Sequence, residues 1–282
     1  MYKIDLHLHT TASDGSDTPR ELLKLADEAG LKVISITDHD TLAGCIEAIN
    51  TPYGDVKVIT GIEFSCHHYG ECDFDCHILG YGFDPESPDL LAAIAHGREM
   101  RLAKLEARLK YLDSRFGIRF DESELEWLRS LNSVARPHLG RLLVKRGVAP
   151  SMAEAMDTYL KGEGFPDDRI DAKEAIQAII KAGGIPVYAH PLGGEREIRL
   201  TREELVPRID ALVAVGLRGL ECYYSRYSSV DSALLARLAG ERGLFKSAGS
   251  DYHGKNKTVE LGRLSSDSDG SEVDATVISL FT

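Results

Sequence analysis

The sequence lacks long apolar runs and is poor in cysteine. No stretch of about eighteen apolar residues is present, which argues against a membrane-spanning helix. No basic-then-apolar leader is seen, so we expect no secretory signal and a cytoplasmic location. The five cysteines are odd in number and scattered, which favours free thiols over disulfides. Cys72 and Cys76 are closely spaced, but they lack the second paired element of a structural zinc site.

Basic residues are fewer than acidic residues. The chain has 33 Lys and Arg against 45 Asp and Glu, which gives a formal net charge of -12. This balance argues against broad electrostatic binding to duplex DNA or to an anionic membrane. A phosphate held by metal ions and a few arginines remains compatible with it, because carboxylates that bind cations count as bare charges in the sum. At 282 residues the chain is long enough for one large α/β domain with an insertion.

The first fifteen residues carry the clearest chemical signal. Residues 4–9 alternate apolar and polar side chains as a strand does, so His7 and His9 project from the same face. The small polar residues that follow indicate a loop in which Asp14 can turn back toward both imidazoles. Imidazole and carboxylate together suit zinc, manganese or iron. Two solvated histidines on a strand are the alternative for this motif alone.

Polar residues also follow a second predicted strand. The apolar run 33–36 leads to Thr37-Asp38-His39-Asp40. Between the two strands we expect a helix with Thr18 as its N-cap, Pro19 at the first helical position and Glu21 at the third. Strand, helix, strand is the unit of a parallel sheet, and α/β folds build active sites at the C-terminal ends of its strands. Capping of the next helix by Asp38 and Asp40 is the alternative, although it leaves His39 unexplained.

Several later strand ends repeat this pattern. Glu63 stands among apolar neighbours, where an unpaired carboxylate is costly, so we expect a cation or hydrogen-bond partner for it. A lone histidine in a strand is more often a core residue, but that reading would have to hold for six of the ten histidines. We therefore predict a centre for several metal ions. Its further members are His77, His190, Asp251 and His253.

The middle of the chain differs from both ends. Residues 88–116 form a charged amphipathic pattern typical of a long helix, and shorter helical patterns follow it. No strand pattern appears between 88 and 183. We therefore expect an inserted helical subdomain over 88–165 inside a barrel-like body made of 1–87 and 166–282.

One stretch of this insertion suggests an anion site. Arg136 stands at a predicted helix start with Pro137 at the first helical position, so its guanidinium and the free backbone amides could clamp a phosphate together. Ser133 and His138 flank it. An ordinary surface arginine before a helix is the alternative.

Taken together, these motifs resemble those of the polymerase and histidinol phosphatase (PHP) superfamily, from the N-terminus to about residue 254. The resemblance implies an α/β fold, a distorted (β/α)7 barrel, with two or three divalent ions. Manganese is the favoured metal, and zinc or iron is possible. The resemblance also implies one ion on His7, His9, Glu63 and Asp251, a second on Glu63, His77 and His190, and a third on Asp14, His39 and His253.

The insertion resembles the branch of that superfamily that acts on nucleoside 3',5'-bisphosphates and on the 5' end of short RNA. The resemblance implies a metal-dependent phosphoesterase in which a metal-bound hydroxide attacks phosphorus. Ser133, Arg136 and Arg226 would hold a second phosphate, while His138, Asp251 or a metal-bound water would protonate the leaving group.

Three other functions share these residues. A phosphatase for a small metabolite such as histidinol phosphate would use the same metal ligands. A non-catalytic PHP module that only binds would be expected to lose ligands, whereas all nine positions are present here. A C-N or lactone hydrolase could also use such a metal site, and activity on amides without activity on phosphate esters would distinguish it.

Overall fold

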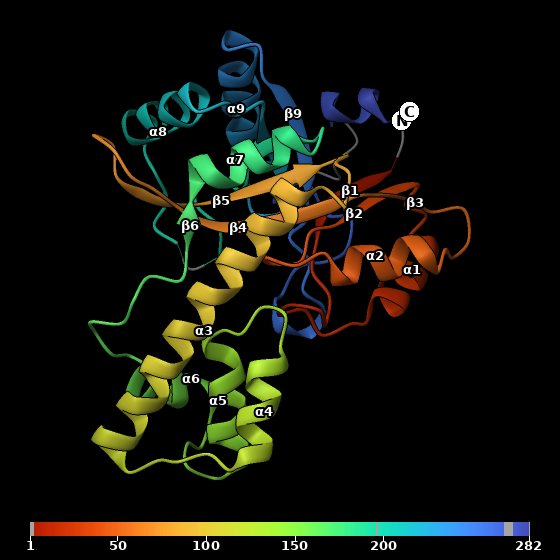
Figure 1. Ribbon diagram of the computed structural model, residues 1–282. Helices are drawn as coiled ribbons and strands as arrows, with labels where there is room; N and C mark the ends of the chain where they lie inside the picture. The colour runs from red at the N-terminus through yellow and green to blue at the C-terminus, as the bar shows by residue number, and fades with distance from the viewer. Residues whose placement is uncertain (1–2, 196, 268–272, 282) are drawn as a thin grey trace. The chain divides into compact units, whose positions relative to one another are not determined.

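The computed structural model describes residues 3–195, 197–267 and 273–281 (Figure 1). Contacts divide the chain into two compact units. We call residues 1–93 and 170–282 the sheet unit, and residues 94–169 the helical unit. The acidic loop that the sequence indicates over 265–271 lies partly outside the described residues.

The sheet unit contains two β-sheets. The smaller one is parallel throughout, in the order β1-β2-β3, and consists of β1 (Ile4–Leu8), β2 (Val33–Ile36) and β3 (Lys57–Ile59). The larger one is mixed and runs in the order β6-β4-β5-β7-β8-β9. Its strands are β4 (Gly61–His68), β5 (Phe74–Tyr81), β6 (Ile170–Asp171), β7 (Ile185–Tyr188), β8 (Gly219–Tyr224) and β9 (Phe245–Gly249).

The larger sheet departs from the strand-helix-strand pattern at β5, which pairs antiparallel with both β4 and β7, and at β6. Strands β4 and β5 pair antiparallel, because the short segment between them contains no crossover helix. Strand β6 pairs with β4 through Ile170 and Asp171, so the prediction of no strand between 88 and 183 was wrong there. Two residues are too few to produce a recognisable period.

Isolated bridges join the two sheets. Leu8 pairs with Tyr252 beyond β9, and His39 pairs with Glu63 in β4. The Asp251 amide also donates to the His7 carbonyl, with 2.9 Å between N and O. Within the described residues these bridges do not form a continuous ladder, so closure into a barrel stays a prediction. They nevertheless bring the ends of β1, β2, β4 and β9 together.

Helices of the sheet unit pack on the strands (Figure 1). Thr18 caps the first of them with a capping box, as its sequence predicts. The core between the strands includes Leu6, Leu79 and Val187, each fully buried. The helices are α1 (Pro19–Glu28), α2 (Ala43–Asn50), α7 (Ala172–Lys181), α8 (Arg202–Ala214) and α9 (Ser229–Glu241), with 3-10 turns at Gly254–Asn256 and Thr276–Leu280.

The helical unit has its own apolar core. The predicted long helix over 88–116 is confirmed by α3 (Pro88–Phe116), whose first residues belong to the sheet unit. Leu112 of α3, Leu128 and Leu143 are fully buried in this core. The other elements are α4 (Glu122–Ser130), α5 (Arg136–Lys145), α6 (Met152–Glu154) and a π-helical turn (Ala155–Tyr159).

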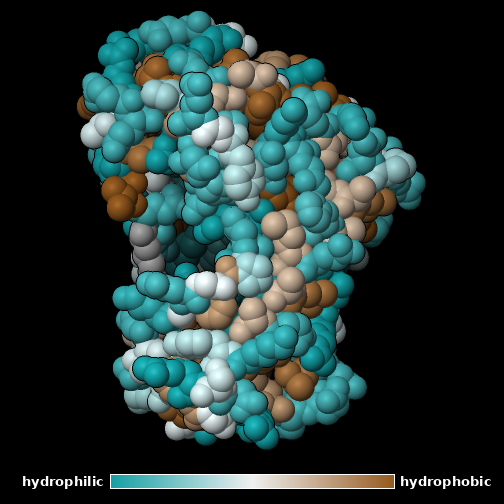
Figure 2. All heavy atoms as spheres, turned by 60° about the vertical axis from the view of Figure 1, so that its left-hand side comes forward, coloured by the Kyte–Doolittle hydropathy of each residue, from teal (hydrophilic) through white to brown (hydrophobic). Residues whose placement is uncertain are grey.

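Hydrophilic residues cover most of the face shown in Figure 2, and hydrophobic residues interrupt them in small groups. Among the described residues, no helix combines the length and the apolar character needed to cross a membrane.

Candidate metal centre

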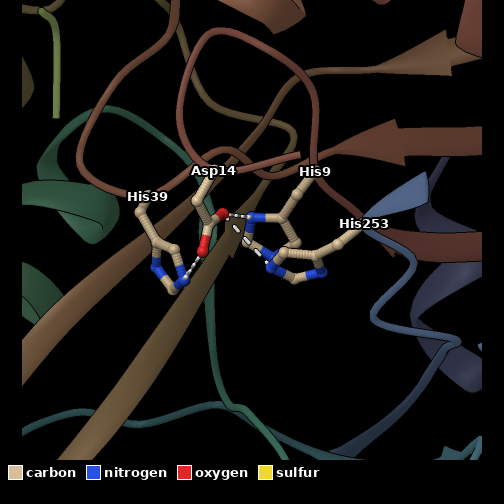
Figure 3. Close-up of side chains that lie close together, drawn as sticks. All are labelled: His9, Asp14, His39 and His253. Atoms are coloured by element: carbon tan, nitrogen blue, oxygen red, sulfur yellow. Dashed lines mark ion pairs between the residues drawn. The ribbon is translucent and has the colours of Figure 1, made fainter. Parts of the chain in front are cut away.

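The loop after β1 brings its acidic residue back to the histidines. Figure 3 shows Asp14 between His9, His39 and His253, which come from three separate strand ends. One carboxylate oxygen, Oδ1, lies 3.6 Å from His9 Nδ1 and 3.2 Å from His253 Nε2. The other, Oδ2, lies 4.0 Å from His39 Nε2. Asp14, which follows β1 in a loop, thus contributes to the same cluster as the three histidines.

Glu63 is the hub of a second group. It lies in β4, is 1% exposed, and is surrounded by five imidazoles. Burial would normally raise the pKa of such a carboxyl, but the neighbouring imidazoles lower it well below its usual value, so Glu63 is ionised. Glu63 Oε1 lies 3.3 Å from His7 Nε2, 3.0 Å from His77 Nδ1 and 3.4 Å from His190 Nε2, and Oε2 lies 3.2 Å from His9 Nε2 and 3.1 Å from His39 Nδ1.

Asp251 connects the two groups. Its Oδ1 lies 3.6 Å from His7 Nε2, 3.5 Å from His9 Nε2 and 3.4 Å from His253 Nδ1. Its Oδ2 accepts hydrogen bonds from Tyr224 Oη at 2.9 Å and Lys257 Nζ at 2.8 Å. Oδ1 of Asp251 therefore faces the imidazoles, while hydrogen bonds to Oδ2 hold the side chain in place.

Strained backbone accompanies these side chains. His190 has φ 30° and Asp251 has φ 61°, in the left-handed region that residues other than glycine seldom adopt. Such conformations cost about 1–3 kcal/mol each and persist where the surroundings fix them, commonly at functional sites. Both residues contribute side chains to the cluster, His190 beside Glu63 and Asp251 beside His7.

The donor set fits divalent metal ions. Buried imidazole nitrogens of His7, His9, His39 and His253 make no hydrogen bond within the described part of the chain. An imidazole nitrogen left without a partner is costly, and a metal ion would supply one. Imidazole and carboxylate ligands together suit manganese, zinc and iron. Among the residues that the structure describes, three sets have ligand atoms within 4.8 Å of one another: His9, Asp14, His39 and His253; His7, His9 and Glu63; and His39, Glu63 and His77.

Comparison with known proteins decides the family. The PHP domain matches residues 5–182. The chain belongs to the PHP family.

Curated relatives cover nearly the whole chain. A phosphoribosyl 1,2-cyclic phosphate 1,2-diphosphodiesterase of Eggerthella lenta is 34% identical over 89% of this chain and 94% of its own. A 5'-3' exoribonuclease of Haemophilus influenzae is 32% identical over 93% of both chains. A 3',5'-nucleoside bisphosphate phosphatase of Chromobacterium violaceum is 30% identical over 90% of this chain and 88% of its own.

A solved structure agrees with this family assignment. A protein of Bifidobacterium adolescentis described as a metal-dependent phosphoesterase superposes with a TM-score of 0.75 and 29% identity, over 94% of this chain and 93% of its own. This PHP protein is therefore an enzyme, a metal-dependent phosphoesterase with an α/β fold of mixed sheets.

The ligand sets of the PHP enzyme overlap more than the resemblance implied. His9 belongs both to the set around Asp14 and to the set with His7 and Glu63. His39 likewise lies near Asp14 and near Glu63. The resemblance already implies that Glu63 serves two ions, and the positions of His9 and His39 are compatible with further sharing between neighbouring sets. The assignment of ligands to individual ions stays a prediction.

Protons compete for these nitrogens. Burial lowers the pKa of His7, but Glu221, Glu63 and Asp251 together raise it well above its ordinary value. The pKa of His190 rises to about 10, because its contacts with Glu197 and Glu63 outweigh burial. A metal ion binding to such rings must displace their protons, so metal affinity increases with pH.

A buried carboxylate behind the centre escaped the sequence analysis. Glu221 in β8 is fully buried; its Oε1 lies 2.9 Å from His7 Nδ1, and its Oε2 accepts the His190 amide at 2.7 Å. A carboxylate on the far nitrogen of a metal-binding histidine fixes its tautomer and orientation. The signal was present, since Glu221 stands among apolar residues in the same way as Glu63.

Asp38 is a second residue with an outer role. It accepts hydrogen bonds from the Thr10 amide at 2.8 Å, the Thr10 hydroxyl at 2.7 Å and the Ser13 hydroxyl at 2.6 Å. The N-cap of α2 is Leu42, without a side-chain hydrogen bond, so the interpretation of Asp38 as a helix cap was wrong. Instead, Asp38 holds the loop that carries Asp14.

Replacement of Glu221 by Gln is expected to lower the affinity for Mn²⁺ by about 10–100-fold. The neutral amide would no longer fix the tautomer and orientation of the His7 imidazole as the carboxylate does. Competition with a chelating dye measures the change. Glu47→Gln, at an exposed position of α2, is the matched control and should bind as the parent does. Unchanged affinity in Glu221→Gln would show that Glu221 does not support the ligand.

The predicted substrate residues fall in different units. Ser133 and His138 are buried in the helical unit, and Arg136 is exposed as the first residue of α5. His138 Nδ1 accepts the Ala135 amide at 3.1 Å, which leaves the proton on Nε2. Arg226 lies in the sheet unit, where it pairs with Glu195 at 2.8 Å.

Proposed function

We propose that this PHP phosphoesterase acts on nucleotides that carry a second phosphate, namely nucleoside 3',5'-bisphosphates and the 5' end of short RNA. One observation carries the proposal: arginines gather in the helical unit around Arg108, which is buried and whose Nε has no hydrogen-bond partner among the described residues. The names of the Chromobacterium violaceum and Haemophilus influenzae relatives agree with this substrate class.

Arg108 is at the centre of the cation cluster. It is 8% exposed, and its Nε has no hydrogen-bond partner within the described residues. Burial lowers its pKa to about 10; Asp168 opposes this, while Arg136, Arg101 and Arg169 add to it. The guanidinium groups of these three arginines are therefore close enough to repel that of Arg108.

Carboxylates lie among these cations as well. Asp168 Oδ1 binds Lys104 Nζ at 2.6 Å, Arg101 and Arg108 help to lower the pKa of Asp168, and Asp167 lies 3.5 Å from Arg169. The buried Nε of Arg108 still makes no hydrogen bond among the described residues, and a buried donor without a partner is costly. A phosphate group is the matching partner, because its oxygens accept the paired donors of guanidinium groups.

The start of α5 adds backbone donors to the cluster. Its N-cap, Ala135, offers no side-chain acceptor, so the first-turn amides are not all satisfied within the helix. Such amides favour an anion at the helix N-terminus. Arg136 begins this helix, and we infer that Arg136 with Ser133 holds the second phosphate; Arg226 is the further arginine that the resemblance to the family implies for substrate binding.

The nine clustered side chains would hold two or three divalent ions, with manganese proposed and zinc or iron as alternatives. When bound, the ions activate water near neutral pH and neutralise charge on phosphoryl oxygens. The chain's own residues orient the ligands and shield the reaction. We assign protonation of the leaving group to His138 Nε2 or to Asp251. We further infer that the sheet unit is the distorted (β/α)7 barrel and the helical unit its insertion.

Phosphate release from adenosine 3',5'-bisphosphate, AMP and histidinol phosphate, measured side by side with Mn²⁺, tests the substrate class. Release from the bisphosphate well above that from the other two is the expected result, and short 5'-phosphorylated RNA is then the next substrate. Preference for histidinol phosphate would overturn the proposal and retain only the metal centre.

A cyclic phosphodiester is a second candidate. It is favoured by the 34% identity, over nearly full length, to the Eggerthella lenta diphosphodiesterase. Phosphoribosyl 1,2-cyclic phosphate therefore belongs in the same comparison of substrates.

Arg136→Ala is expected to lower kcat/KM for adenosine 3',5'-bisphosphate by about 100-fold and for AMP by less than threefold, because only the bisphosphate has a second phosphate to hold. Arg141→Ala, an exposed arginine of the same helix, is the matched control and should affect neither. Equal losses on both substrates would contradict the clamp.

A further inference from the structure

A cavity of about 330 Å³ adjoins the metal centre inside the sheet unit. Two of the clustered side chains, His77 and His190, form part of its wall. Strands β5 and β7 pair antiparallel, and the first residues of β5, from Phe74, extend past Tyr188 at the end of β7. The cavity lies beside this extension of β5. A molecule whose phosphate lies at the histidines can therefore place its adjoining part in this cavity.

The lining of the cavity suits a flat ring. Phe74 and Tyr188 are buried beneath it, and the Arg208 guanidinium lies 4.8 Å from the centroid of the Phe74 ring. Aromatic rings and guanidinium planes are the surfaces on which nucleobases stack. Ile198, another lining residue, is 88% exposed, an unusual state for a large aliphatic side chain.

Charge argues against a phosphate as the occupant. Asp75 and Glu197 also line the cavity, so two carboxyl side chains face the space that the substrate would enter. Arg208 also lines the cavity, and its guanidinium is already packed on Phe74. Two carboxylates repel a second phosphate but leave a neutral ring unaffected.

We propose that this cavity binds the nucleobase of the substrate, stacked against Arg208 and covering Ile198. The proposal rests on the proposed function, since it takes the occupant to be the base of the nucleotide that is hydrolysed. Its volume is at the lower end of the range of small-molecule pockets, about 300–1,000 Å³, which suits one base better than an oligonucleotide.

The test compares adenosine 3',5'-bisphosphate with 1,4-anhydroribitol 3,5-bisphosphate, in which hydrogen replaces the base. Both are assayed with Ile198→Ser and Arg208→Met in the Mn²⁺-loaded enzyme. The ratio of kcat/KM for the first substrate over the second is expected to fall by about fivefold or more in each variant, because base stacking is lost. Val230→Ser, at another strongly exposed aliphatic residue, is the matched control and should leave the ratio unchanged.

The outcomes separate the two proposals. An unchanged ratio in both pocket variants, with the bisphosphates still hydrolysed, would overturn the base site and leave the proposed function intact. Hydrolysis of neither bisphosphate by the parent enzyme would overturn the proposed function and this occupant with it. A general loss of folding would lower turnover of both substrates together, whereas loss of a base site changes their ratio.

Discussion

Glu63→Gln is expected to reduce phosphate release by about a thousandfold or more, equivalent to roughly 4 kcal/mol in the barrier. Both oxygens of this carboxylate are engaged, and between them they face five imidazoles. The amide keeps the shape of the side chain but loses the charge that holds cations, and it cannot accept through both ends. The parent and the variant are compared in turnover of adenosine 3',5'-bisphosphate and in bound manganese by elemental analysis.

Two controls accompany this variant. Glu260→Gln changes a carboxylate whose side chain is 83% exposed, and it should retain parental activity. The circular dichroism spectrum of Glu63→Gln should match that of the parent, since glutamine has nearly the same shape as glutamate. Near-parental turnover would mean that the reaction does not depend on the hub, and the assignment of Glu63 as a ligand would be wrong.

Gly249→Ala is expected to destabilise the fold by about 1–3 kcal/mol and to disrupt the metal centre as well. A Cβ at Gly249 would stand 2.1 Å from His7 Cβ and 2.8 Å from the His7 amide nitrogen. Both neighbours belong to a fully buried strand residue, so neither can move away cheaply. Either β9 or β1 must shift, and β1 carries the first two histidines.

Urea unfolding and manganese binding measure the two effects of Gly249→Ala. Gly240→Ala is the matched control: nothing lies within 4 Å of a Cβ there, and the residue is in α9. In that helix alanine should stabilise by about 0.5–1 kcal/mol. Parental stability together with parental metal binding in Gly249→Ala would contradict the close approach of the two strands.

Elements that depend on neighbouring residues were predictable. Thr18, Pro19 and Glu21 announce the start of α1, and the structure confirms both the capping box and the first helical position. The apolar period over 88–116 likewise predicts α3. The β4–β5 hairpin was not anticipated, because its long apolar strands look the same whether their partners are parallel or antiparallel.

The sequence by itself determined the chemical inventory of this enzyme: histidines and carboxylates at successive strand ends, an arginine at a helix start, and too little positive charge for a broad nucleic-acid surface. Each depends on residue type and on local spacing. Only the tertiary structure decided which of these groups lie next to one another in the folded protein. His7 and Glu221 are 214 positions apart, and their contact, like the crowding of cations around Arg108, arises from packing that no local pattern encodes.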